Sequence, residues 1–321
     1  MSEKEILSAA EELLHVKADS AKALPTNGPD RHWNFRVRGG RKSYLVRVEN
    51  PVAVAQRGTR LDEEAEIVKF FSHYGLAPRL LASGIYKGRR VIVEEWIYGR
   101  RLPKRLTRGH LKKVIAFLAR VNDVPYTSGK RLVKWKEDFL DVRARRIVLE
   151  KRLREGRGVR EFRPLVKKLA PILEEGAEAL RAKIERFPKT LLKKPVFCYR
   201  DVTSSNILDT GSRVVAVDWE RHSVGISDPS FSLVVLMRRY RLGAREREFV
   251  FSEYRRCRRA PRLREFLEVR NLERILGEAT WGLSWVTRRK KLHLPVRKRE
   301  IAGTIVQIEK NIRELRGVLK G

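Results

Sequence analysis

The stretch FCYRDVTSSNILDTGSRVVAVDWE, residues 197–220, decides the predicted fold of this 321-residue chain. Two short apolar runs, at residues 207–208 and 214–217, are joined by the tight turn DTGS at residues 209–212. Apolar runs on either side of a turn rich in Asp, Gly and Ser predict a β-hairpin. Because a short hairpin folds back on itself, the chain just before it and the chain just after it are expected to lie side by side.

Three oxygen-bearing side chains flank this predicted hairpin. Asp201 and Asn206 lie five positions apart on the loop that precedes it, and Asp218 ends its second strand. We therefore expect Asp218 to lie close to Asn206, with Asp201 beside them. A carboxylate and an amide oxygen that leave coordination positions open suit Mg²⁺. Unpaired carboxylates next to apolar strands are costly to bury, which favours a functional site over an ordinary surface hairpin.

The same stretch resembles two related catalytic patterns. YRDVTSSNIL, residues 199–208, is similar to the catalytic loop of protein kinases, where Tyr can replace the usual His. VDWE, residues 217–220, followed by Ser227-Asp228-Pro229, resembles the aminoglycoside phosphotransferase and choline kinase-like family, a branch of the protein-kinase-like superfamily. The resemblance covers most of residues 20–240 as an ordered set of short signals, and residues 199–229 are its specific core.

The resemblance implies a role for each residue. Asp201 would accept or orient the proton of the acceptor hydroxyl, and Asn206 and Asp218 would hold the Mg²⁺ ions that bridge the ATP phosphates. Asp228 would be structural, bonding the catalytic-loop backbone. Two departures stand out: Tyr199-Arg200 replaces the His-Gly common in small-molecule kinases of this type, and Ser227-Asp228-Pro229 replaces the family's Gly-Asp-Pro, a minor change. In addition, no Lys or His follows Asp201 closely.

Regions on both sides of this core complete an α+β, two-lobed, protein-kinase-like fold. The N-terminal lobe, residues 1–98, is predicted to be a small β-sheet with one inserted helix, and the mostly helical C-terminal lobe, residues 99–321, holds the catalytic loop and the acceptor site. The sheet is predicted from the hairpins Trp33–Arg38 with Tyr44–Val48 and Leu80–Ile85 with Arg90–Trp96, and the inserted helix covers Leu61–Tyr74.

The predicted sheet supplies candidate ATP-binding residues in the expected order. Asn27 and Gly28 precede the first strand and resemble the phosphate-covering loop of these kinases, although Asn-Gly is first of all a turn. Arg47, in YLVRV, stands where protein kinases carry Lys, and its planar guanidinium can grip phosphate oxygens. Alternatively, Arg47 is an outward-facing residue of an alternating strand.

Two further positions complete the predicted nucleotide site. Glu64, on the apolar stripe of its helix, is the candidate ion-pair partner of Arg47, with Glu63 and Glu66 as competitors because one sequence does not fix the helix register. Glu95 to Ile97 would form the hinge whose backbone meets the adenine, although a plain edge strand has the same pattern.

The formal net charge of +33 is the most unusual feature of the overall composition. It indicates either a polyanionic partner, RNA or an anionic lipid surface, or a proteome that is basic throughout. The basic segments Arg255–Arg264 and Arg288–Lys291, with Tyr254, Trp281 and Trp285 nearby, could bind RNA phosphates and stack on bases. The opening residues carry no signal-peptide pattern, no apolar run is long enough to span a membrane, and cysteines are few, so a cytoplasmic location is predicted.

These features predict an ATP- and Mg²⁺-dependent kinase that phosphorylates a small-molecule hydroxyl. Asp228 follows Asp218 by only ten positions, which leaves no room for the activation segment of protein kinases. The Arg- and Lys-rich helical half favours a neutral or anionic acceptor, such as a sugar or polyol, over a cationic one. The alternatives are a kinase acting on a macromolecule, with RNA ahead of protein, and a non-catalytic pseudokinase that binds without catalysis.

Overall fold

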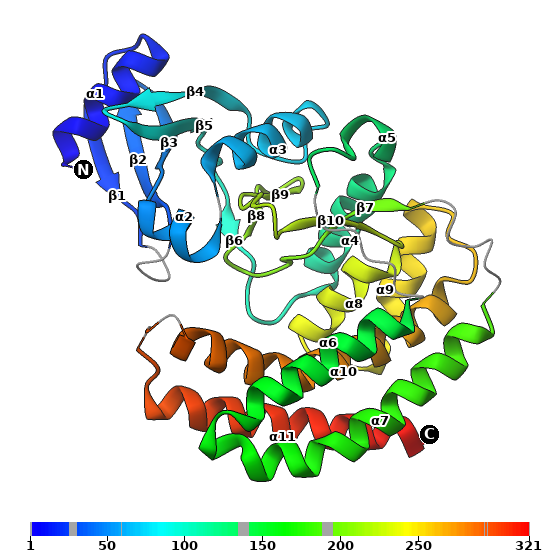
Figure 1. The fold of residues 1–321 in the computed structure, drawn as a ribbon. Coiled ribbons are helices and arrows are strands. Elements are labelled where there is room, and N and C mark those ends of the chain that lie inside the picture. The colour runs from blue at the N-terminus through cyan, green and yellow to red at the C-terminus, as the bar shows by residue number, and fades with distance from the viewer. Residues whose placement is uncertain are drawn as a thin grey trace. The chain divides into compact units, whose positions relative to one another are not determined.

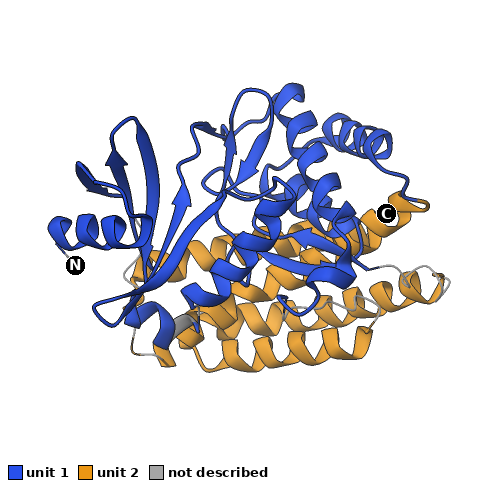
Figure 2. Ribbon diagram, turned by 90° about the horizontal axis from the view of Figure 1, so that it is seen from above, with its two compact units in different colours: residues 1–137, 195–260 blue, residues 138–194, 261–321 orange. Residues whose placement is uncertain are grey.

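The computed structural model describes residues 2–25, 31–58, 60–133, 141–187, 195–291, 293 and 295–320. The chain forms two compact units, residues 1–137 with 195–260 and residues 138–194 with 261–321, coloured separately in Figure 2. The boundary predicted between residues 98 and 99 falls inside the first unit. The division of the chain at that point stays a prediction.

A five-stranded antiparallel sheet of order β1-β2-β3-β5-β4 opens the first unit (Figure 1). Its strands are β1 (Ser20–Ala23), β2 (Trp33–Gly39), β3 (Lys42–Val48), β4 (Leu80–Tyr86) and β5 (Arg89–Glu95). Both predicted hairpins are confirmed. In the first hairpin Gly39 pairs with Lys42, so its turn lies one residue later than predicted. In the second, Lys87 and Gly88 have φ values of 47° and 73°, which two-residue hairpin turns require.

Helices cover both faces of this sheet. The helices of the first unit are α1 (Glu3–Leu14), α2 (Pro51–Arg57), α3 (Leu61–His73), α4 (Arg108–Asp123), α5 (Tyr126–Gly129), α8 (Ser230–Arg239) and α9 (Ala244–Cys257). Successive strand residues point to opposite faces. Val91 and Val93 therefore pack in the cluster beneath α1, whereas Ile92 packs against α3. This alternation also sends Arg47 and Glu94 to the α3 face, where the pocket described below begins.

Two small sheets follow the hinge. β7 (Val196–Tyr199) pairs with β10 (Val224–Ser227), and β6 (Arg100–Arg101) pairs with the hairpin of β8 (Ile207–Asp209) and β9 (Val214–Ala216). The predicted hairpin at residues 207–217 is thus confirmed. A Cβ at Gly99 would lie 2.9 Å from the carbonyl oxygen of Asp209, so only glycine fits this close approach of the two backbones.

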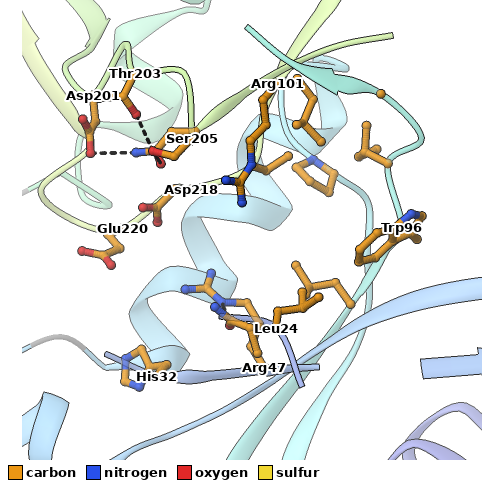
Figure 3. A pocket seen from close by; sticks show the side chains of 18 of the residues that line it. Leu24, His32, Arg47, Trp96, Arg101, Asp201, Thr203, Ser205, Asp218 and Glu220 are labelled. Atoms are coloured by element: carbon orange, nitrogen blue, oxygen red, sulfur yellow. Dashed lines mark hydrogen bonds between the residues drawn. The ribbon is translucent and has the colours of Figure 1, made fainter. Parts of the chain in front are cut away.

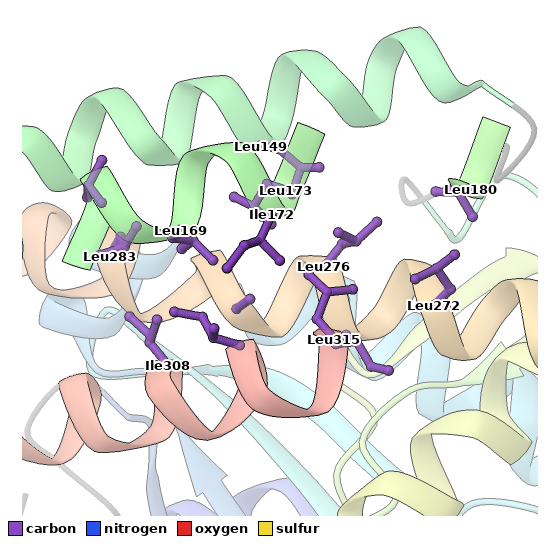
Figure 4. Packing of buried hydrophobic residues seen from close by; sticks show 14 of the residues in the cluster. Leu149, Leu169, Ile172, Leu173, Leu180, Leu272, Leu276, Leu283, Ile308 and Leu315 are labelled. Atoms are coloured by element: carbon purple, nitrogen blue, oxygen red, sulfur yellow. The ribbon is translucent and has the colours of Figure 1, made fainter. Parts of the chain in front are cut away.

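The second unit is helical. Its elements are α6 (Val142–Arg157), a 3₁₀ turn (Arg160–Phe162), α7 (Arg163–Glu185), α10 (Leu263–Lys291) and α11 (Lys298–Lys320). Buried Leu, Ile, Val and Phe side chains from these helices form one cluster, part of which Figure 4 shows. The helix predicted over Trp135–Leu153 begins at Val142, because the Asp141 side chain caps it by accepting the Ala144 N–H; residues 134–140 lie outside the described part. No helix in the described ranges is long and apolar enough to cross a membrane.

Candidate active site

The hairpin β8–β9 brings the three predicted site residues of the catalytic loop together. The backbone N–H of Val217 donates to the carbonyl oxygen of Asn206 at 2.9 Å, which places Asn206 beside the strand that leads to Asp218. The Asn206 side-chain amide donates to Asp201 Oδ2 at 2.7 Å. Asp201 and Asp218 line the same pocket, with the buried Glu220 next to them (Figure 3).

Tyr199 packs beneath the backbone that carries Asp218 and holds it in place. Its ring is fully buried, and its hydroxyl donates to the carbonyl oxygen of Asp218 at 3.0 Å. Trp219 is also fully buried and stacks on Phe71 of α3, with ring centroids 4.4 Å apart. Tyr199 therefore fixes the backbone that carries Asp218.

Arg47 projects from β3 into the same pocket and is held by several partners. Its Nη2 lies 2.7 Å from Glu64 Oε2, and its Nε donates to Asn34 Oδ1 at 3.2 Å. The predicted ion pair with Glu64 is present. Of the two competitors, Glu63 contacts Arg221 at 2.7 Å and Glu66 is exposed.

A second buried carboxylate, Glu94, also lies near the Arg47 guanidinium. Glu94 is fully buried on β5, with its Oε1 3.7 Å from Arg47 Nη1. Burial raises the pKa of Glu94 to about 7, and the charge of Arg47 only partly offsets this rise. Burial likewise raises the pKa of Glu64 to about 8. The guanidinium is therefore surrounded by more carboxylate groups than it can neutralise.

Replacing Glu94 by Gln is expected to stabilise the protein at high pH. The folded chain holds the Glu94 proton up to a pKa of about 7 instead of the usual 4.5, so unfolding releases protons in this window and stability falls as pH rises through it. The variant should gain on the order of 1–3 kcal/mol in unfolding free energy at pH 8 and almost nothing at pH 4. Urea denaturation across this range measures the difference, with Glu66→Gln on the exposed face of α3 as the control. An unchanged pH slope in Glu94→Gln would contradict the assignment.

The pocket has a volume of about 620 Å³, within the range of ligand sites. The predicted hinge residues Glu95 and Ile97 both line it. The Glu95 N–H is taken by the Arg79 carbonyl oxygen at 2.9 Å, whereas the Ile97 backbone makes no hydrogen bond within the described ranges. Ile97 is therefore free to donate to a bound base. The predicted loop residues Asn27 and Gly28 lie outside the described residues.

Several cations of the pocket were not predicted from the sequence. Arg31 forms an ion pair with Glu220, at 2.6 Å between Nη1 and Oε1. Arg239 lines the pocket from the end of α8. Arg101, on the two-residue strand β6, extends into the pocket (Figure 3), and neither its guanidinium nor that of Arg239 has an ion-pair or hydrogen-bond partner in the part of the chain that is described. The adjacent arginines at 100 and 101, just after the hinge, were the available signal.

Asn206 and Asp218 provide a donor set that fits Mg²⁺. Both offer hard oxygen atoms, and the Asp218 carboxylate has no hydrogen-bond or ion-pair partner among the described residues, although it lies near the like charges of Glu220 and Asp201. A bound cation would relieve that repulsion. Within the described ranges no three His, Cys, Asp or Glu side chains form a metal site by themselves. Ligands to Mg²⁺ would therefore include the Asn206 amide and oxygens of the substrate.

The aromatic residues proposed for RNA binding differ in their surroundings. Tyr254 is fully buried and its hydroxyl donates to Asn122 Oδ1 at 2.6 Å, so the hypothesis that it stacks on bases is wrong. Trp281 is 56% exposed and packs on Trp285, with ring centroids 6.2 Å apart and Arg289 beside Trp285. Binding of RNA by this part of α10 stays a prediction.

Comparison with known proteins identifies the family of this chain. Residues 30–267 match the family described as the phosphotransferase enzyme family. Because the match covers most of the chain, the protein belongs to this family of phosphotransferases. A comparison with curated protein sequences gave no match.

Solved structures define the fold. Spectinomycin phosphotransferase APH(9)-Ia, in complex with ADP and spectinomycin, is similar with a TM-score of 0.67 and 12% identity over 100% of this chain and 99% of that chain. Macrolide 2'-phosphotransferase MphH from Brachybacterium faecium has a TM-score of 0.65 and 13% sequence identity, over 95% of this chain and 97% of that chain. Choline kinase LicA from Streptococcus pneumoniae has a TM-score of 0.60 and 16% sequence identity, over 97% of this chain and 98% of that chain. The predicted kinase-like fold and the predicted phosphotransferase family are confirmed.

Proposed function

We propose that this phosphotransferase moves the γ-phosphoryl group of ATP, held with Mg²⁺, to a hydroxyl group of a small molecule that is neutral or anionic. One observation carries the proposal: Asp201, bonded to Asn206, lines a pocket that also contains Asp218 and the Arg47–Glu64 ion pair. ATP as donor is supported by the similar spectinomycin phosphotransferase, which was solved with ADP. The ten-residue interval after Asp218 supports a small acceptor over a protein.

Asp201 is the proposed catalytic base. Its Oδ2 accepts from Asn206, which leaves Oδ1 without a partner in the described part of the chain. Oδ1 can therefore accept the hydrogen of the acceptor hydroxyl and orient its oxygen toward phosphorus. As the new P–O bond forms and the bond from the γ-phosphorus to its bridging oxygen breaks, the hydroxyl proton passes to Asp201.

Arg47 would bind the phosphate oxygens of ATP. Glu64 and Asn34 hold its guanidinium in place before the substrate arrives, so little ordering is needed on binding. Asn206 and Asp218 would hold Mg²⁺, which neutralises charge on the phosphates when bound. Arg101 lies in the same pocket without a partner among the described residues. It would add positive charge that the catalytic loop, with Thr203 to Ser205 after Asp201, does not provide.

The charges around Asp201 favour an anionic acceptor over a cationic one. Burial raises the pKa of Asp201, and the nearby cations Arg239 and Arg31 oppose this effect. Arg239 has no ion-pair partner within the described ranges. An unpaired guanidinium next to the base repels a cationic acceptor and attracts an anionic one.

Replacing Arg239 by Gln is expected to change acceptor preference. With a sugar phosphate as acceptor, kcat/KM should fall about tenfold or more, because one charge-assisted contact is lost, whereas values for a neutral polyol should change little. Coupled detection of ADP with a panel of sugars, polyols, sugar phosphates, choline and an aminoglycoside measures this. Arg245→Gln, on the exposed face of α9, is the matched control. Preference of the wild type for choline or an aminoglycoside over all neutral and anionic acceptors would contradict the proposed class.

A further inference from the structure

A second cavity, of about 460 Å³, adjoins the hinge within the first unit. The hinge residues Glu95, Trp96 and Tyr98 line both this cavity and the nucleotide pocket, so the hinge is a wall that the two share. We call the cavity the hinge pocket; its charged and aromatic walls are Arg41, Lys42, Arg79, Tyr44, Trp96 and Tyr98. The proposed phosphate transfer uses none of the three cations.

Positive charge predominates in the hinge pocket. None of Arg41, Lys42 and Arg79 has an ion-pair or side-chain hydrogen-bond partner in the described part of the chain. Glu95 is the acidic residue in the wall, and one of its oxygens, Oε1, accepts the Arg79 backbone N–H at 2.9 Å. Arg41, Lys42 and Arg79 are exposed and line one cavity, where like charges repel one another, and a bound anion would relieve this repulsion.

Aromatic rings form the other part of the wall. Tyr98 is 64% exposed and lines the cavity beside Trp96. The Arg36 guanidinium lies 4.6 Å from the centre of the Trp96 ring, which fixes the indole at the hinge. Leu14 and Leu81 add apolar surface. Flat rings of this kind bind planar ring systems by stacking.

We propose that the hinge pocket binds a small anion that carries a planar ring, about the size of a nucleoside monophosphate. The three cations would contact the anionic group, and Trp96 and Tyr98 would contact the ring. The volume is sufficient for one such molecule. The cations that line the hinge pocket do not line the nucleotide pocket, so their replacement tests this site separately from the proposed phosphate transfer.

Isothermal titration calorimetry with AMP tests the site on the full chain. The wild type is expected to bind one AMP more per chain than the triple variant Arg41→Gln/Lys42→Gln/Arg79→Gln. This difference of one holds whether or not the nucleotide pocket itself takes AMP, so failure of the proposed function and failure of this site give different results. The triple variant Lys167→Gln/Lys168→Gln/Arg316→Gln, which removes three exposed cations from the second unit, should keep the wild-type stoichiometry.

Two further ligands separate the anion from the ring. Adenosine, which lacks the phosphate, and ribose 5-phosphate, which lacks the ring, should each bind the hinge pocket at least tenfold more weakly than AMP. The single variant Arg79→Gln, with an unchanged circular dichroism spectrum, should weaken the second AMP by about tenfold. Equal stoichiometry in the wild type and the hinge-pocket triple variant would overturn the proposal, as would binding of ribose 5-phosphate as tight as that of AMP.

Discussion

An Asp201→Asn variant is expected to lose roughly 10²–10⁴-fold in kcat for phosphate transfer, because the amide cannot take the hydroxyl proton. The substituted side chain keeps its shape and can still accept from the Asn206 amide through its oxygen. The loop should therefore stay in place, and ATP should bind with nearly unchanged affinity. The loss should appear in kcat and not in KM for ATP, because the residue acts on the acceptor and not on the nucleotide.

Steady-state kinetics with calorimetric ATP binding measures both parts of this prediction. Asp209→Asn is the matched control: Asp209 lies on the same hairpin but outside the pocket, where it bonds to Lys113 at 2.8 Å. Its kcat should stay within a factor of about two to three of the wild type, since the residue does not line the pocket. An Asp201→Asn variant that transfers phosphate at the wild-type rate would remove Asp201 from the catalytic role.

An Asp218→Asn variant is expected to show opposite effects on activity and on stability. Activity should fall by at least about 10³-fold, since loss of the anionic ligand leaves the proposed Mg²⁺ site with one charge fewer. The ligand-free protein, however, should become more stable, because burial and the like charge of Glu220 disfavour the Asp218 carboxylate and the charges of Arg47 and Arg31 only partly offset this. Such a gain on removing a functional charge is the usual trade-off between activity and stability at active sites.

Thermal unfolding with and without ATP and Mg²⁺ separates these effects. The wild type should be stabilised by ATP with Mg²⁺ more than by ATP alone, and Asp218→Asn should lose that Mg²⁺-dependent part. Asp209→Asn again serves as the control, because its carboxylate is neutralised by Lys113. A variant at Asp218 that is less stable without ligands but retains the Mg²⁺ response would show that the residue is structural.

The elements with strong local signals were predicted correctly. Both N-terminal hairpins, α3 and the β8–β9 hairpin have clear periodicity or turn residues, and the hairpin alone implied that Asp218 and Asn206 are neighbours. Choosing Glu64 over Glu63 required the orientation of α3, which depends on packing of Leu61 and Ala65 beneath β5. Consecutive helical residues lie about 100° apart around the axis, so an uncertainty of that size in the orientation of α3 exchanges Glu63 and Glu64.

The cations that line the nucleotide pocket were missed because nothing in the local sequence places them there. Arg101 reaches the pocket because β6 pairs with β8 over two residues, a strand too short to show alternation. Arg239 arrives from the end of α8, and Arg31 is placed by its ion pair with Glu220, which is distant in sequence. In a chain with 72 Lys and Arg residues, the adjacent arginines at positions 100 and 101 were too weak a signal to distinguish the few that line a site.

Transfer of label from γ-³²P-ATP tests the central claim most directly. The protein would be incubated with Mg²⁺ and with separated small-metabolite, RNA and protein fractions of its own cell extract. We predict label in the small-metabolite fraction, bound through an ester to a hydroxyl, and dependent on both Mg²⁺ and Asp201. Label in the RNA or protein fraction, or no label in any fraction from a protein that binds ATP, would contradict the proposed small-molecule kinase.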